Sequence, residues 1–100
     1  MNIIKIFDKN TLTIKLKGKL DNRTAPELEE ELKKELPAVT NLVLDFDELN
    51  YISSVGLRVI VSTQKIMKKQ GKMVIENVNS FVMEVLDAAR SVNNLTVKKA

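Results

Sequence analysis

The stretch Leu-Val-Leu-Asp-Phe at residues 42–46 is short and almost continuously apolar. Such a run is typical of a strand that helices cover on both faces, so we expect it at the centre of a sheet. A helical pattern follows from Ser54 to about Lys69, and Gly71 stands where a helix C-terminus favours glycine. The apolar positions of this helix are Leu57, Ile60, Val61 and Met67. The pattern therefore predicts a buried central strand followed by an amphipathic helix.

The same alternation continues towards the C-terminus. Residues 72–76 form another short apolar run, and an amphipathic helix is predicted from Ser80 onwards. The apolar positions of that helix are Val82, Val85, Leu86 and Ala89. A terminal strand is expected at residues 95–98.

Two strands are predicted before the central one, at residues 3–7 and 11–17. The second alternates strictly between apolar and polar residues, so one of its faces should be buried. Its apolar residues are Leu12, Ile14 and Leu16. A short polar turn joins the two strands, which should pair antiparallel, and Gly18 interrupts the pattern.

The next helix has clear start and stop signals. Thr24 and Glu27 have the spacing of a capping box, with Pro26 in the first helical turn. Pro37 ends the helix, because the residue before a proline avoids helical geometry. Its core stripe consists of Leu28, Leu32 and Leu36.

This order of elements predicts an α/β sandwich within one domain, residues 1–100. We expect a mixed sheet of four to five strands with three or more helices. Right-handed crossovers through the helices should make the later strand pairs parallel.

Composition excludes several function classes. The 100 residues include no cysteine and no histidine, so disulfides, cysteine-based zinc sites and Ser-His-Asp catalysis cannot be built. No phosphate-binding glycine loop and no Gly-x-Ser-x-Gly elbow occurs. A lysine-activated serine is poorly placed, because Lys65 and Lys69 lie roughly 16 and 22 Å down the helix from Ser54. We therefore expect no enzyme and no cofactor.

Charge and hydropathy point to a cytoplasmic protein that binds neither nucleic acid nor membrane. Sixteen basic against thirteen acidic residues give a net charge of only +3, and the lysines gather near a helix C-terminus, where cations are favourable. No run of about 18 apolar residues could span a bilayer. Asp45, Asp47 and Glu48 invite a metal interpretation, but carboxylates at a strand end are more often solvated, so we expect no metal site.

The segment from Tyr51 to Leu57 joins the central strand to its helix, at the kind of edge where α/β folds place ligand and partner sites. From spacing alone, the plain interpretation of Ser54 is a helix cap, worth about 1 kcal/mol over alanine.

Two segments carry a family resemblance. Residues 49–60 resemble the STAS signature, in which an acidic or small residue, a phosphorylatable serine, a small residue and Gly-Leu open the second helix. Residues 18–25 are similar to the family's Gly-x-Leu-Asp-x-x-Thr-Ala segment. The order of elements matches over essentially the whole chain, so the sequence resembles the anti-sigma-factor antagonists of the STAS family.

The resemblance implies a non-catalytic docking protein. Such an antagonist binds an anti-sigma factor with serine-kinase activity, is phosphorylated by it, and is reset by a metal-dependent serine phosphatase. Ser54 falls on the phosphorylated position. Ser53 stands where the best-known members have aspartate, so Ser53 is the less favoured second candidate. The implied partner-binding residues are Asp21, Asn22, Thr24, Ser53, Ser54, Val55, Gly56, Leu57 and Arg58.

One alternative stays open within the same family. STAS-like domains also serve as constitutive docking subunits of transporters or signalling complexes, in which the serine caps the helix and is never phosphorylated. The segment Ser91–Leu95 also lacks the Ser-Gly-Leu that commonly follows the third helix, which leaves the C-terminal packing undefined.

Overall fold

Five strands form one sheet in the order in which they occur along the chain, β1-β2-β3-β4-β5. This arrangement comes from a computed structural model that describes all residues from 1 to 100. The strands are β1 (Asn2–Asp8), β2 (Thr11–Leu20), β3 (Asn41–Ile52), β4 (Lys72–Val78) and β5 (Val97–Lys99). The helices are α1 (Ala25–Glu35), the short 3-10 helix η1 (Leu36–Ala38), α2 (Ser54–Gln70) and α3 (Ser80–Arg90).

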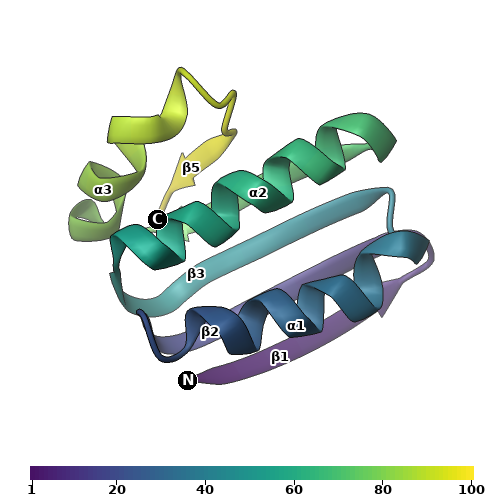
Figure 1. The fold of residues 1–100 in the computed structure, drawn as a ribbon, viewed down its shortest axis with the longest axis horizontal. Helices are drawn as coiled ribbons and strands as arrows, with labels where there is room; N and C mark the ends of the chain where they lie inside the picture. Colours follow the sequence, from purple (N-terminus) through teal and green to yellow (C-terminus); the bar gives the residue numbers. More distant parts are fainter.

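The strand directions follow from the connections. A two-residue turn joins β1 to β2, and these strands are antiparallel, with Ile3 opposite Leu16 and Phe7 opposite Leu12. The three later pairs are parallel, and a helix crosses over between the strands of each pair. Figure 1 shows α1 and α2 side by side in front of the sheet, with α3 next to the start of α2. The predicted mixed sheet with three α-helices is confirmed.

The central strand is covered on one face only, so the expectation of two covered faces was wrong. Leu42, Leu44 and Phe46 are buried, whereas Val43 and Asp45 between them are half-buried. Strands that follow one another in the sheet through right-handed crossovers receive all their helices on the same side. The other face of the sheet is open to solvent.

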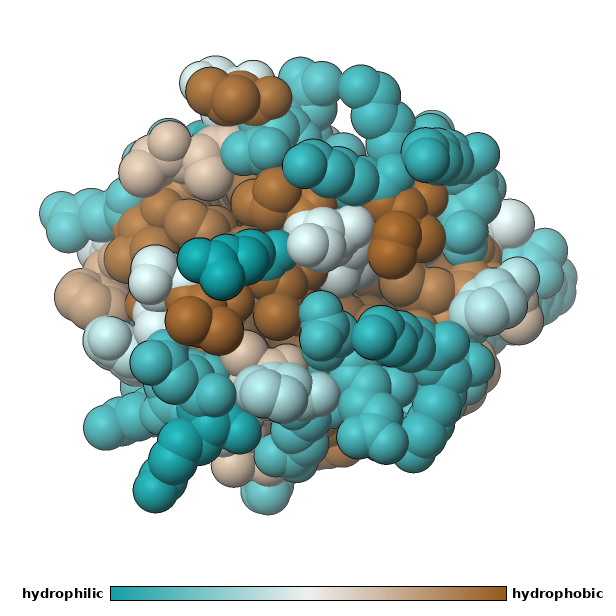
Figure 2. Space-filling view, viewed as in Figure 1, coloured by the Kyte–Doolittle hydropathy of each residue, from teal (hydrophilic) through white to brown (hydrophobic).

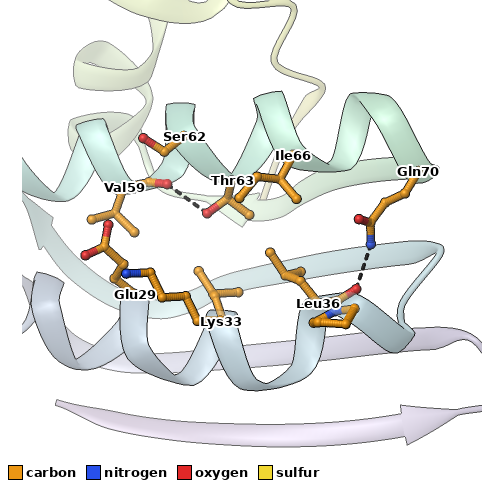
Figure 3. A pocket seen from close by; sticks show the side chains of 10 residues that line it. Glu29, Lys33, Leu36, Val59, Ser62, Thr63, Ile66 and Gln70 are labelled. Atoms are coloured by element: carbon orange, nitrogen blue, oxygen red, sulfur yellow. Dashed lines mark hydrogen bonds between the residues drawn. The ribbon is translucent and has the colours of Figure 1, made fainter.

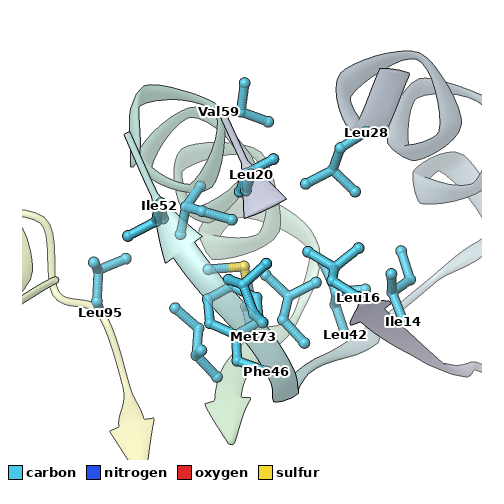
Figure 4. Close-up of a cluster of buried hydrophobic side chains, with 14 of the residues drawn as sticks. Ile14, Leu16, Leu20, Leu28, Leu42, Phe46, Ile52, Val59, Met73 and Leu95 are labelled. Carbon is cyan, nitrogen blue, oxygen red and sulfur yellow. The ribbon is translucent and has the colours of Figure 1, made fainter. Parts of the chain in front are cut away.

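The core lies between the sheet and the helices (Figure 4). The predicted stripe of α1 is buried, and Ile60 and Met67 of α2 are fully buried against the sheet. Thr63 is the only buried polar side chain, and its hydroxyl donates a hydrogen bond to the Val59 carbonyl at 2.8 Å. The apolar surface buried on this face stabilises the packing of the helices on the sheet, by about 25 cal/mol for each Å². No helix is both long and apolar enough to cross a bilayer.

β2 and β5 have other bounds than the sequence pattern predicts. β2 continues past Gly18, which has a φ of +104° and lies at a shift in the register with β3. Glycine adopts that backbone conformation at little cost, so the strand bends there and still reaches Leu20, opposite Ile52. The predicted terminal strand forms as β5, two residues later than its expected start.

Candidate docking site

The carboxyl ends of β2, β3 and β4 meet at one edge of the sheet, where α1, α2 and α3 begin (Figure 1). Two long-range hydrogen bonds tie this edge together. The Ser53 amide donates to the Leu20 carbonyl at 2.9 Å, and the Asn79 side-chain amide donates to the Leu49 carbonyl at 2.9 Å. The two segments singled out in the sequence, residues 18–25 and 49–60, therefore lie next to each other.

Gly56 allows the start of α2 to approach the end of β2. A Cβ atom at this position would lie 2.8 Å from both the Cγ atom and the carbonyl oxygen of Leu20, and 3.2 Å from Cγ1 of Ile52. Gly56 is itself buried, so it has no surface to offer a partner. Its contribution to the site is to bring the neighbouring residues of α2 against the β2 end.

Ser53, and not Ser54, caps α2. Ser53 has extended backbone geometry, and its hydroxyl accepts a hydrogen bond from the Gly56 amide at 3.1 Å. This is the usual arrangement of an N-cap residue. Ser54 is the first helical residue and is exposed to solvent. The plain interpretation of Ser54 as the cap was therefore wrong: the structural task belongs to its neighbour.

Asp21 organises the turn that leads into α1. One of its carboxylate oxygens accepts hydrogen bonds from the amides of Arg23 at 2.9 Å and Thr24 at 3.1 Å. These backbone hydrogen bonds, Arg23 first and Thr24 second, lower the pKa of Asp21 below its ordinary value of 3.8. The Asp21 carbonyl then accepts from the Ala25 amide at 2.8 Å. Asp21 is thus held as a carboxylate in a fixed turn.

The predicted capping box at Thr24 does not form. Thr24 precedes α1, but its side chain makes no cap hydrogen bond to the helix. Its hydroxyl instead donates to the Lys19 carbonyl at 2.8 Å and accepts from the Asp21 amide at 2.8 Å. Thr24 has helical backbone angles, which differ from the extended geometry of a usual N-cap, so its hydroxyl turns back to the strand end.

The remaining predicted partner-binding residues differ in accessibility. Asn22 and Arg58 are exposed, whereas Val55 and Leu57 are half-buried against the core. Arg58 follows Ser54 by four residues, so both lie on the same face of α2, one turn apart. Asn22, Ser54 and Arg58 are consequently the members of the predicted set that a docked protein can reach most easily.

Sequence analysis missed an exposed aromatic pair beside this site. Tyr51 at the end of β3 and Phe81 at the start of α3 stack with ring centroids 5.9 Å apart and an interplanar angle of 22°. Their exposed fractions are 39% and 50%, which is high for such large side chains. The sequence feature that could have indicated this pair was Phe81, an aromatic residue immediately before the predicted apolar stripe of its helix.

An apolar groove runs between α1 and α2 (Figure 3). Its volume is about 240 Å³, and Gln70 closes one end by donating to the carbonyls of Leu36 and Val39, each at 2.6 Å. Ile66 lines it and is 45% exposed. Figure 2 shows hydrophobic side chains at the surface of this helix-covered face, with polar ones around them. Ile66 follows Ser54 by twelve residues, which is about 18 Å along α2.

Two of the three carboxylates considered as metal ligands, Asp45 and Glu48, have protein partners. Asp45 accepts from the Asp47 amide and from the Asn77 side chain, both at 3.0 Å. Glu48 forms an ion pair with Lys17 at 3.1 Å. These hydrogen bonds and this ion pair lie at the strand ends and on the open face of the sheet.

Comparison with known proteins identifies the fold. The profile of the STAS domain family matches residues 2–99. The chain belongs to the STAS domain family. This STAS domain is 30% identical over 81 residues to a Bacillus subtilis protein named anti-sigma-B factor antagonist, covering 80% of the chain and 74% of that protein.

Two further similarities extend this result. BtrV of Bordetella bronchiseptica, whose name describes a proposed anti-sigma factor antagonist, is 35% identical over 74 residues, covering 72% of the STAS domain and 64% of BtrV. The solved structure of an anti-sigma factor antagonist from Mycobacterium paratuberculosis has a TM-score of 0.87 at 16% identity, covering 99% of this chain and 86% of that one. At that level of identity the structural likeness establishes the fold.

Proposed function

We propose that this STAS domain is an anti-sigma-factor antagonist that docks an anti-sigma factor through the edge around Ser54. Phosphorylation of Ser54 by the serine-kinase activity of that partner ends docking, and a serine phosphatase restores it. The observation that carries the proposal is the division of labour between two adjacent serines: Ser53 caps the helix, and Ser54 presents its hydroxyl to solvent. The names of the two sequence relatives support the same role.

The fold can accept a phosphate at Ser54. The first helical residues of α2 have amides without intrahelical partners, and the helix dipole favours an anion there by about 0.3–1 kcal/mol. Arg58, one turn further along the same face, offers a guanidinium to the phosphate. The modification therefore acts on the docked partner and leaves the domain folded.

A partner at this edge would experience the change directly. The phosphate adds about −1.5 to −2 charges and three acceptor oxygens in the middle of the contact surface. Because about 1.4 kcal/mol changes an affinity tenfold, one desolvated charge is enough to release a docked protein. The contact surface that we propose consists of Asn22, Ser54 and Arg58, extended by the aromatic pair Tyr51 and Phe81. Aromatic and arginine side chains commonly carry much of the binding energy at such surfaces.

The test uses the anti-sigma factor with a serine-kinase sequence from the same organism. The purified proteins are incubated with magnesium and ATP, and the modified residue is mapped by mass spectrometry. Binding is measured by calorimetry for the wild type and for Ser54→Ala and Ser54→Asp. We expect one phosphate on Ser54, wild-type affinity for Ser54→Ala, and at least about tenfold weaker binding for Ser54→Asp.

Ser53→Ala is the matched control, because it removes the adjacent hydroxyl and leaves the proposed acceptor in place. This variant should still be phosphorylated at Ser54. A phosphate mapped to Ser53 would contradict the proposed division of labour. If the two proteins bind but no residue is phosphorylated, the domain is a constitutive docking subunit and the proposed switch is wrong.

A further inference from the structure

The two edges of the sheet differ in length and protection. β5 has three residues, two of which are exposed lysines, and short charged edges deter pairing with another chain. β1 has seven residues and is the outermost strand on the other side (Figure 1). Half of its backbone amides and carbonyls point away from β2, towards solvent. β1 is therefore the edge on which a further strand can be added.

β1 also exposes large apolar side chains that the fold does not bury. Ile4 is 39% exposed, Ile6 is 48% exposed and Phe7 is 55% exposed. Ile4 and Ile6 lie opposite Lys15 and Thr13 of β2, on the open face of the sheet. An edge of this kind gains apolar burial as well as hydrogen bonds when another strand pairs with it.

The sequence of β1 is nearly symmetric about its central residue, Lys5. On each side of Lys5 there are two apolar residues and then one polar residue. An antiparallel pair of β1 strands centred on Lys5 would place Ile4 opposite Ile6 on one face and Ile3 opposite Phe7 on the other. If the two β1 strands were shifted along each other to the next register, a charged residue would instead lie opposite an apolar one. This self-complementarity is the property that a two-fold interface between identical chains requires.

Lys5 would normally discourage such pairing, because lysine in an edge strand repels its counterpart. Here its ammonium group donates to Glu31 and, at 2.8 Å, to Glu35, both on α1. These hydrogen bonds raise the pKa of Lys5 above 10.5 and lower the pKa of Glu31 below 4.5. Each copy therefore brings carboxylates that compensate the lysine at the symmetry axis.

We propose that β1 is a self-association edge, through which a second copy of the chain pairs antiparallel and joins the two sheets into one. A single strand pair buries less than the roughly 1,200 Å² of a stable complex, so the dimer should be weak and concentration-dependent. The inference rests on β1 and α1 alone and does not depend on the proposed docking function.

Sedimentation velocity over a wide range of protein concentration provides the first test. The wild type should shift from a species of 11.3 kDa towards twice that mass as concentration rises. The double variant Ile4→Lys, Ile6→Lys should stay monomeric while its circular dichroism spectrum remains that of the wild type. Val92→Lys is the matched control, because Val92 is an 83% exposed apolar residue outside β1, and this variant should associate like the wild type.

Cysteine cross-linking tests the register, because the chain has no cysteine of its own. Residues directly opposite each other in antiparallel strands are about 5 Å apart, whereas diagonal neighbours are about 7–8 Å apart, too far for a disulfide. A mixture of Ile4→Cys and Ile6→Cys proteins should form a covalent dimer on oxidation, and each variant alone should not. A monomer at every concentration, or a dimer that survives the lysine variant, would overturn the proposal. Equal cross-linking of the single variants would overturn its register.

Discussion

Replacing Ser53 and Ser54 by alanine, one at a time, separates the structural serine from the proposed acceptor. Ser53→Ala deletes the oxygen that accepts from the Gly56 amide at 3.1 Å and leaves that amide without a partner inside the protein. Ser54→Ala deletes a hydroxyl that faces solvent in the first helical turn. The two changes are chemically identical and one residue apart, so each is the control for the other.

The two variants should differ by about 1 kcal/mol in the free energy of unfolding. Loss of a serine N-cap costs about 0.5–2 kcal/mol, which corresponds to a lower Tm by about 4–8 °C per kcal/mol in a chain of this size. The Ser54→Ala change touches no hydrogen bond or core contact, so its effect should stay within about 0.5 kcal/mol. Alanine also has the highest helix propensity, which offsets any small loss at that position.

Urea and thermal unfolding, followed by far-UV circular dichroism, measure both values on the isolated chain. A clear loss of stability for Ser53→Ala with an unchanged Ser54→Ala would support the assignment of the cap. Equal losses would mean that both hydroxyls serve the helix. A loss confined to Ser54→Ala would refute the reasoning, since it would place the cap one residue later.

Three further outcomes are expected. Gly71→Ala should destabilise the domain by about 2–3 kcal/mol in urea unfolding, because the added Cβ would lie 1.8 Å from the Thr40 carbonyl oxygen; an unchanged midpoint would contradict that contact. Phe81→Ala should weaken anti-sigma-factor binding about tenfold in calorimetry at unchanged Tm, and an equal affinity would remove the aromatic pair from the contact surface. The folded-state pKa of Asp21 lies below 3.8 because of the Arg23 amide, so its ionised form stabilises the fold above about pH 3.8 and this contribution is lost as pH falls further. Asp21→Asn should therefore lose stability relative to the wild type near neutral pH, with a smaller difference in acid unfolding below pH 3.8; a constant difference would exclude the charge as the cause.

Periodic patterns in the sequence were enough to predict the elements and their order. The alternation of Leu12, Ile14 and Leu16 and the four-residue spacing in α1 identified buried faces correctly. Such patterns identify buried faces because side-chain direction repeats every two residues in a strand and every 3.6 residues in a helix. This periodicity does not depend on which element packs against that face.

The same patterns failed at the ends of the elements. Thr24 and Ser54 were expected to cap helices, but the Thr24 hydroxyl bonds to the Lys19 carbonyl and the Asp21 amide, and the oxygen that caps α2 belongs to Ser53. Which of two nearby oxygens forms a cap depends on backbone angles of one or two residues. Those angles are set by where the preceding strand ends, as the hydrogen bond from Ser53 to Leu20 illustrates.

The sequence alone thus predicts the two family motifs, and it also predicts a mixed sheet with an accessible edge. Each of these features depends on residues that are close together along the chain. Tertiary structure decides which residues share that edge. Tyr51 meets Phe81, and Gly71 meets Thr40, across about thirty residues of chain. It also decides that the helices cover a single face and that the outer edge of β1 has no partner strand. These features follow from strand order and crossover handedness, which no local spacing of residues encodes.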